Sequence, residues 1–181
     1  KDDFSHNPTH PAAADKTPNG FCPRYLAARK AIDDRALNHH VWETLHLALA
    51  QTSGSEPLRI LEIGAGIGTM LERVVERGLL TGPTVYVASD SDPGQLKAAR
   101  QELSQWAQKR GDTLFWSGEH QCRLRTAGAD VSVVLDLASA EELAGRPHTL
   151  GPFDLLIAHA VLDLIDFPAL LPRLLPQIKA N

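Results

Sequence analysis

The sequence predicts an α/β fold with a mostly parallel sheet and helices on both faces. Short apolar runs alternate with helical patterns along the chain, which favours strands joined through helices by right-handed crossovers. One of these runs leads directly into a glycine-rich loop, as ligand-binding strands in such sheets do. With 181 residues, of which 43% are hydrophobic and 22% charged, the chain has the composition of a folded globular domain.

The first part of the chain precedes this alternation. Residues 1–20 are rich in Pro, Asn, Asp, Ala and His and carry no apolar period, so we expect a flexible tail. From Pro23 to Gln51 apolar residues recur at three- and four-residue steps. We therefore expect an N-terminal helical segment over 21–52 and an α/β domain over 57–181.

Local patterns predict the first two strands and the helices that follow them. The apolar run Leu58–Ile63 predicts a strand, and the pattern after it predicts a helix over Thr69–Leu80. The run Thr84–Ala88 predicts the second strand. Pro93 suits the first turn of a helix, which we expect to reach Arg110.

The second half of the chain adds a hairpin and two further strands. Two short β runs, Thr113–Trp116 and Gln121–Thr126, flank four mostly polar residues and predict a β-hairpin insertion near 113–126. Val131–Leu135 and Phe153–Ala158 are mostly apolar runs, and each predicts a further strand, the second of them buried.

Two shorter helical signals occupy this half. We expect a short helix over 138–144. The stretch Phe167–Ala180 carries leucines at helical steps, but Pro168, Pro172 and Pro176 cannot all lie in one regular helix. We therefore predict short turns there.

The strongest single feature is the loop Gly64-Ala65-Gly66-Ile67-Gly68, between a predicted strand and a predicted helix. Glycine has no Cβ, so this backbone can approach a ligand closely, and the helix start adds free N–H groups. A dinucleotide-binding loop requires a third glycine five positions after the first, whereas Gly68 is four positions after Gly64. Glu62, two positions before Gly64, would repel a pyrophosphate and attract an amino group. The loop therefore disfavours NAD(P) and FAD.

The run from Ile60 to Thr69 resembles the first motif of class I S-adenosylmethionine-dependent methyltransferases, and the resemblance covers about 57–165. It implies a Rossmann-like three-layer sandwich and an enzyme that uses S-adenosyl-L-methionine and releases S-adenosyl-L-homocysteine. In that family the loop cradles the amino acid part of the cofactor. The residues that the resemblance assigns to this role are Glu62, Gly64, Ala65, Gly66 and Gly68. An ion pair at the strand edge is the alternative for Glu62.

Further matches to the family lie after the later strands. Asp90, with Ser91 beside it, matches the acid that binds the ribose hydroxyls, since a carboxylate can accept hydrogen bonds from both. Asp136 resembles the acid that meets the adenine amino group, and Leu137 would meet the ring. Residues 153–162 resemble the fourth-strand motif. Each of the two acids has a structural alternative, as the N-cap of the helix that follows it.

His159 is the candidate catalytic residue. It follows the fourth main strand, where a substrate could reach it, and imidazole suits a general base. Lining the cofactor pocket is its alternative role. Asp163 and Asp166 are the next candidates, although Asp166 also suits a helix N-cap. Arg29, or its neighbour Arg24, could pair with a carboxylate of the cofactor or substrate from a helix over the site, and a solvated helix face is the alternative.

Composition and the absence of certain motifs limit the classes of substrate that we expect. The formal net charge is −4, which disfavours nucleic acid, and the motifs of DNA methyltransferases (Asn-Pro-Pro-Tyr, Pro-Cys) are absent. We therefore expect a small-molecule substrate and no nucleic-acid partner, membrane insertion or metal, with a homodimer left open. Cys22 and Cys122 have no metal-ligand spacing and fit a reducing cytoplasm. The alternatives are a non-catalytic methyltransferase-like binding module and an NAD(P)-binding oxidoreductase.

The resemblance also implies a sheet of seven strands, of which this chain supplies the first four main ones. We therefore expect the chain to be a fragment whose domain is incomplete at its C-terminus. The strand Phe153–Ala158 would then form an exposed apolar edge.

Overall fold

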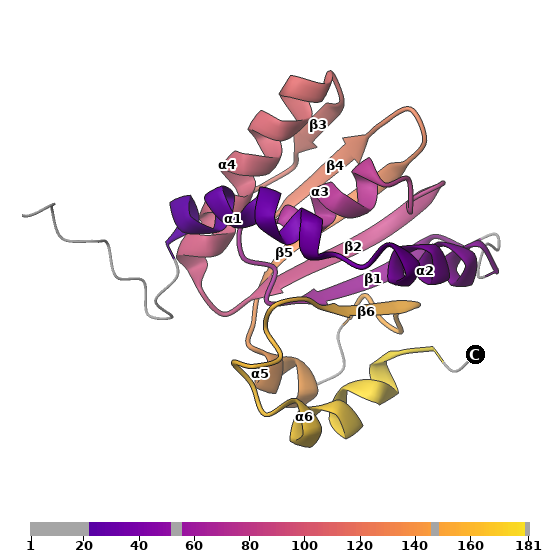
Figure 1. Ribbon diagram of the computed structural model, residues 1–181, viewed down its shortest axis with the longest axis vertical. Helices are drawn as coiled ribbons and strands as arrows, with labels where there is room; N and C mark the ends of the chain where they lie inside the picture. The colour runs from indigo at the N-terminus through magenta and orange to yellow at the C-terminus, as the bar shows by residue number, and fades with distance from the viewer. Residues whose placement is uncertain (1–21, 52–55, 146–148, 180–181) are drawn as a thin grey trace, which may run out of the picture.

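The computed structural model describes residues 22–51, 56–145 and 149–179, and the expected tail over 1–20 lies outside them. These residues form a six-stranded sheet in the order β3-β4-β5-β2-β1-β6 (Figure 1). Strands β5, β2, β1 and β6 run parallel, while β3 and β4 form an antiparallel hairpin beside β5. The strands are β1 Leu58–Ile63, β2 Pro83–Asp90, β3 Thr113–Trp116, β4 Gln121–Arg125, β5 Asp130–Leu137 and β6 Leu155–Ala158.

Helices connect these strands and precede the first of them. They are α1 Pro23–Ala36, α2 His39–Gln51, α3 Thr69–Glu76, α4 Pro93–Arg110, α5 Ala140–Gly145 and α6 Phe167–Leu174, followed by the 3-10 turn η1 Leu175–Gln177. The predicted N-terminal helical segment is thus two helices, α1 and α2.

Helices cover both faces of the sheet. α2, α3 and α4 share one hydrophobic core with strand residues such as Ile60 and Tyr86. α5 and α6 share a second core with Leu61 and Val87. The two cores lie on opposite faces because successive side chains of a strand alternate. The result is a three-layer sandwich, in which α5 and α6 lie below the sheet in Figure 1.

α4 has the bounds that its local sequence predicts. Pro93 lies in the first turn, and the carboxylate of Asp92 caps it by accepting a hydrogen bond from the Gly94 N–H at 2.7 Å. Gly111 ends the helix with a φ of 73°, which is typical of a glycine C-cap.

α3 and α6 differ from prediction. α3 ends at Glu76 rather than Leu80, because Gly78 adopts a φ of 67° and turns the chain out of the helix. α6 is a helix where we predicted only short turns. It accommodates Pro168 in its first turn, where no N–H is needed, and Pro172 breaks few bonds in so short a helix.

β6 lies at the edge of the sheet formed by the described residues. It pairs with β1, ending at the pair Ile63 and Ala158. Regular pairing begins two residues later than predicted, because Phe153 takes part in a separate parallel bridge to Ile178 on the opposite side.

Candidate functional site

A cavity of about 580 Å³ opens at the carboxyl ends of the parallel strands. Its walls come from the loops after β1, β2, β5 and β6 and from α1. From β1 the chain proceeds to β2 on one side, and β6 returns to its other side, so the cavity lies at the switch point where open α/β sheets bind ligands. Of the predicted site residues, Gly64, Gly66, Asp90, Ser91 and Asp163 line it.

The glycine loop has positive φ at all three glycines, 70° at Gly64, 54° at Gly66 and 83° at Gly68. A Cβ at Gly64 would lie 2.7 Å from Cγ2 of Val161, and one at Gly66 would lie 3.3 Å from Cδ1 of Leu26. Residues with a Cβ rarely adopt these φ values. Backbone conformation and close neighbours therefore both select glycine in this loop.

Asp90, at the end of β2, joins the glycine loop to the start of α4. Its Oδ2 accepts a hydrogen bond from the Gly66 N–H at 2.8 Å, and its Oδ1 accepts one from the Asp92 N–H at 2.9 Å. Burial raises the pKa of this carboxyl above its usual value. The N-cap of α4 is Asp92, so the capping alternative for Asp90 is wrong, and Asp90 faces the cavity.

The segment after β6 forms the opposite wall. Ala160 has a φ of 56°, unusual for a residue with a Cβ, and it turns the chain so that Val161 reaches Gly64. Ala160, Val161 and Asp163 line the cavity, and half-buried His159 directly precedes them. Burial and then the nearby Arg73 cation lower the pKa of His159, partly opposed by Asp33. The imidazole is therefore mostly neutral at pH 7.

No protein-family model and no curated protein matches the chain. Among solved structures, the chain is similar to the plantazolicin methyltransferase BpumL in complex with a triazolic desmethylPZN analog and SAH, with 17% identity and a TM-score of 0.50 over 90% of this chain and 50% of that one. It is also similar to the plantazolicin methyltransferase BamL with SAH, with 15% identity and a TM-score of 0.49 over 86% of this chain and 44% of that one. The chain has the class I methyltransferase fold. It spans about half the length of these structures.

The methyltransferase fold buries Glu62 under the glycine loop rather than on the cavity wall. Its side chain is 3% exposed, and Oε2 accepts a hydrogen bond from the Tyr86 hydroxyl at 2.7 Å. Burial raises the pKa of Glu62 to about 8. The ion-pair alternative at the strand edge is wrong, because Glu62 is buried and hydrogen-bonds to a tyrosine hydroxyl instead of a cation at the surface. Tyr86 lies on the neighbouring strand, and no local pattern pointed to it.

Two other predicted loop residues shape the glycine loop without lining the cavity. Ala65 is buried, its N–H donates to the Ser89 carbonyl at 2.9 Å, and its own carbonyl accepts from the Gly68 N–H at 2.9 Å. Gly68 begins α3 against Leu103 of α4. Both residues therefore hold the loop against the sheet and helices.

Asp136 and Leu137 lie at the end of β5, outside the cavity lining. The wall on this side comes instead from the next residues, among them Ala138 and Ser139. Ser139 and Glu142 cap α5 reciprocally, with a Ser139 N–H to Glu142 Oε2 distance of 2.7 Å. The capping alternative for Asp136 is therefore wrong.

α1 covers the cavity from the side of the glycine loop. Leu26 and Asp33 both line it; Leu26 belongs to the segment around Arg29 that we expect over the site, whereas Asp33 was not predicted as a site residue. Arg24 is exposed, and the side chain of Arg29 lies outside the described part of the structure. Asp166 caps α6, because its Oδ1 accepts from the Ala169 N–H at 3.2 Å.

The cavity wall is acidic. Asp33, Asp90, Glu141 and Asp163 line it, and the described lining contains no lysine or arginine. An acidic wall attracts cations and repels phosphates. Among the described residues, these four acids included, no group of three or more His, Cys, Asp or Glu side chains is arranged to hold a metal ion. None of the described helices is long and apolar enough to span a membrane.

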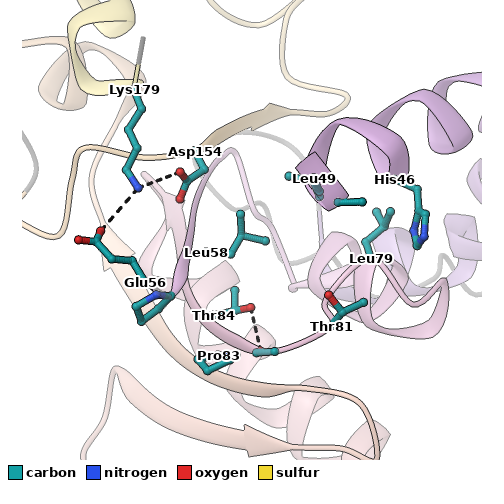
Figure 2. A pocket seen from close by; sticks show the side chains of 13 residues that line it. His46, Leu49, Glu56, Leu58, Leu79, Thr81, Pro83, Thr84, Asp154 and Lys179 are labelled. Atoms are coloured by element: carbon teal, nitrogen blue, oxygen red, sulfur yellow. Dashed lines mark hydrogen bonds and ion pairs between the residues drawn. The ribbon is translucent and has the colours of Figure 1, made fainter. Parts of the chain in front are cut away.

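A second cavity, of about 390 Å³, lies at the opposite ends of the parallel strands, near the amino ends of β1 and β2. Leu49, Leu58 and Leu79 contribute apolar side chains to it. Figure 2 shows Lys179 pointing between two carboxylates, 2.8 Å from that of Asp154 and 4.0 Å from that of Glu56. These contacts join the C-terminal segment to the start of β1 and β6.

Proposed function

We propose that this chain binds S-adenosyl-L-methionine in the cavity at the carboxyl ends of the strands and transfers its methyl group to a small molecule. The observation that carries the proposal is the contact between the glycine loop and Asp90 on one cavity wall. A loop free of Cβ atoms admits an amino acid moiety, and a carboxylate beside it can accept hydrogen bonds from ribose hydroxyls.

The cavity suits this cofactor in size and charge. Its volume of about 580 Å³ lies within the range of roughly 300–1,000 Å³ that is typical of small-molecule sites. S-adenosyl-L-methionine carries a sulfonium and an ammonium group, which the acidic wall attracts. The same wall would repel the pyrophosphate of a dinucleotide, which together with the glycine spacing disfavours an NAD(P)-dependent oxidoreductase.

We assign the cofactor parts to successive loops. The loop Gly64–Gly68, with Glu62 beneath it, would hold the amino acid part, and Asp90 with Ser91 would hold the ribose. The end of β5 would meet the adenine, through Asp136 and Leu137 or the cavity-lining residues after them. Arg29 on α1 would pair with a carboxylate.

The cofactor supplies a methyl group on a good leaving group, so the chain mainly has to align the acceptor. His159 is the proposed general base. Its lowered pKa keeps a ring nitrogen free to take the proton of an acceptor hydroxyl or ammonium group at neutral pH. The half-buried position beside the cavity wall supports this role.

The proposal also covers the location of the protein in the cell, its type of substrate and its oligomeric state. We propose a cytoplasmic enzyme for small molecules, because the cysteines are free thiols and the net charge is −4. A homodimer is the proposed alternative to a monomer, and the molar mass of the protein in solution distinguishes the two.

Titration calorimetry of the whole chain with S-adenosyl-L-homocysteine tests the proposal, followed by methyl transfer from labelled S-adenosyl-L-methionine to a panel of phenols, amines, thiols and carboxylates. We expect binding, weakened about tenfold or more in Asp90→Ala, which loses charge-assisted hydrogen bonds. Glu119→Ala, an exposed acid on the β3–β4 hairpin, serves as the matched control. Absence of binding at millimolar ligand would overturn the proposal, and binding without transfer would support the non-catalytic binding module.

A further inference from the structure

Arg73 is a buried cation to which the proposed reaction gives no direct task. It lies on α3, directly after the glycine loop, and its side chain is 3% exposed. Its Nε donates to Asp34 Oδ1 at 2.6 Å, and a terminal nitrogen donates to the Thr69 hydroxyl at 3.3 Å. A buried guanidinium is costly unless its donors are engaged, so these partners fix its position.

These contacts join α1 to α3. Arg73 also donates to the Lys30 carbonyl at 3.5 Å, and Lys30 forms an ion pair with the buried carboxylate of Glu72. On the same helix the apolar side chains of Tyr25 and Ile32 are exposed. α1 is therefore anchored to the domain largely through polar contacts, of which Arg73 and Glu72 on α3 are the buried members.

The position of α1 decides part of the cavity wall. Leu26 reaches the glycine loop from it, and Asp33 lines the cavity. Asp33 is adjacent in sequence to Asp34, the ion-pair partner of Arg73. The charges of Arg73 and Asp33 both act on His159, which follows β6. Arg73 thus contacts α1, which carries Leu26 and Asp33, and its charge acts on His159 after β6.

We propose that Arg73 is a positioning residue of this site: by joining α1 to α3 it holds Leu26 and Asp33 on the cavity wall beside His159. Its role in ligand binding rests on the proposed function, whereas its role in holding α1 does not. The side chain need not touch the cofactor or the acceptor.

Charge gives this role a signature that a purely structural arginine would lack. Arg73 lowers the pKa of His159, and Asp33 raises it. Removing the cation should therefore raise the pKa of His159. Removing its partner in Asp34→Asn should not raise it, because the cation stays and loses a neutralising neighbour.

Four variants test the proposal: Arg73→Gln, Arg73→Lys, Asp34→Asn and the control Arg123→Gln. The control breaks an exposed pair of the same chemistry, between Arg123 and Asp130 at 2.6 Å on the hairpin side of the sheet. Hydrogen exchange reports the opening of α1, calorimetry the affinity for S-adenosyl-L-homocysteine, and NMR the pKa of His159, assigned with His159→Gln.

In Arg73→Gln we expect exchange of the α1 amides to accelerate about tenfold or more, the dissociation constant to rise about fivefold or more, and the pKa of His159 to increase. Asp34→Asn should likewise accelerate α1 exchange and raise the dissociation constant, but it should not raise the pKa of His159. Arg73→Lys, which retains the charge, should keep the His159 pKa near the wild-type value while loosening α1. Arg123→Gln should change none of the three.

Wild-type exchange of α1 and wild-type ligand affinity in Arg73→Gln would overturn the proposal. If that variant does not fold, the same result in both Arg73→Lys and Asp34→Asn would overturn it. Failure of the wild-type chain to bind S-adenosyl-L-homocysteine would count against the proposed function instead, and α1 exchange and the His159 pKa would still decide the role of Arg73.

Discussion

At the scale of single residues, the glycine loop is constrained by its backbone and by its neighbours. The φ values of Gly64 and Gly66 follow from the turn between strand and helix, so a sequence pattern can predict them. The neighbours cannot be predicted in that way, because Val161 and Leu26 come from distant parts of the chain. The same limit applies to Glu62, whose partner Tyr86 lies on the adjacent strand.

Gly64→Ala should destabilise the protein more than Gly78→Ala. Both glycines have positive φ, 70° and 67°, so each alanine brings strain of about 1 kcal/mol. A Cβ at Gly64 would lie 2.7 Å from Val161, whereas a Cβ at Gly78 would meet nothing within 4 Å. Overpacking at Gly64 should add about 1–3 kcal/mol. Urea denaturation measures the difference, and equal losses would show that the loop after β6 yields without cost.

Glu62 gives stability a pH dependence of definite sign. Its folded pKa of about 8 lies above the ordinary 4.5, so the folded state holds this proton more tightly than the unfolded state. Its contribution is therefore fully present below about pH 4.5 and is lost as the pH rises through 8. Glu62→Gln keeps an acceptor for Tyr86 but cannot ionise.

We expect Glu62→Gln to match the wild type near pH 5 and to exceed its unfolding free energy at pH 9, by at most about 5 kcal/mol. Denaturation curves at the two pH values measure this, with the exposed Glu119→Gln as control. A constant difference between Glu62→Gln and wild type across this range would contradict a raised pKa at Glu62.

At the scale of elements, predictability depends on how local the cause is. α4 was predicted with its bounds because Pro93, Asp92 and Gly111 act within one helical turn. The hairpin β3–β4 was predicted for the same reason. The placement of α1 over the cavity could not be predicted in detail, because it depends on contacts with α3 that are 39 to 43 positions apart in the chain. Consequently Asp33 and Arg73 were missed.

Leu26→Ala should weaken ligand binding more than it weakens the fold. Leu26 contacts the glycine loop and the cavity, yet it belongs to neither hydrophobic core. We expect affinity for S-adenosyl-L-homocysteine to fall about threefold to tenfold, as lost apolar contact implies, with little change in melting temperature. Ile32→Ala, on the same helix but exposed, is the matched control. A large drop in melting temperature without loss of affinity would place Leu26 in the core instead.

At the scale of the whole molecule, the cavities at the two ends of the parallel strands differ in charge. The cavity at the amino ends has acids that are paired with Lys179. The cavity at the carboxyl ends has four lining acids and no described lysine or arginine. Of two ligands that differ by one positive charge, the more positive one should therefore bind more tightly in the cavity at the carboxyl ends. S-adenosyl-L-methionine differs from its product in this way, because only the former carries a sulfonium.

We expect S-adenosyl-L-methionine to bind more tightly than S-adenosyl-L-homocysteine at low salt, by about threefold to tenfold, and the ratio to shrink toward one near 0.5 M salt as screening increases. Calorimetry of both ligands over a salt series measures it. Asp163→Asn should reduce the ratio at low salt, whereas Glu119→Gln should leave it unchanged, since Glu119 lies on the hairpin and not on the cavity wall. Tighter binding of the homocysteine form at low salt would mean that cations outside the described lining neutralise the acidic wall. In the proposed reaction, a preference for S-adenosyl-L-methionine would also help turnover, since the neutral product would leave a wall that favours the next cationic cofactor.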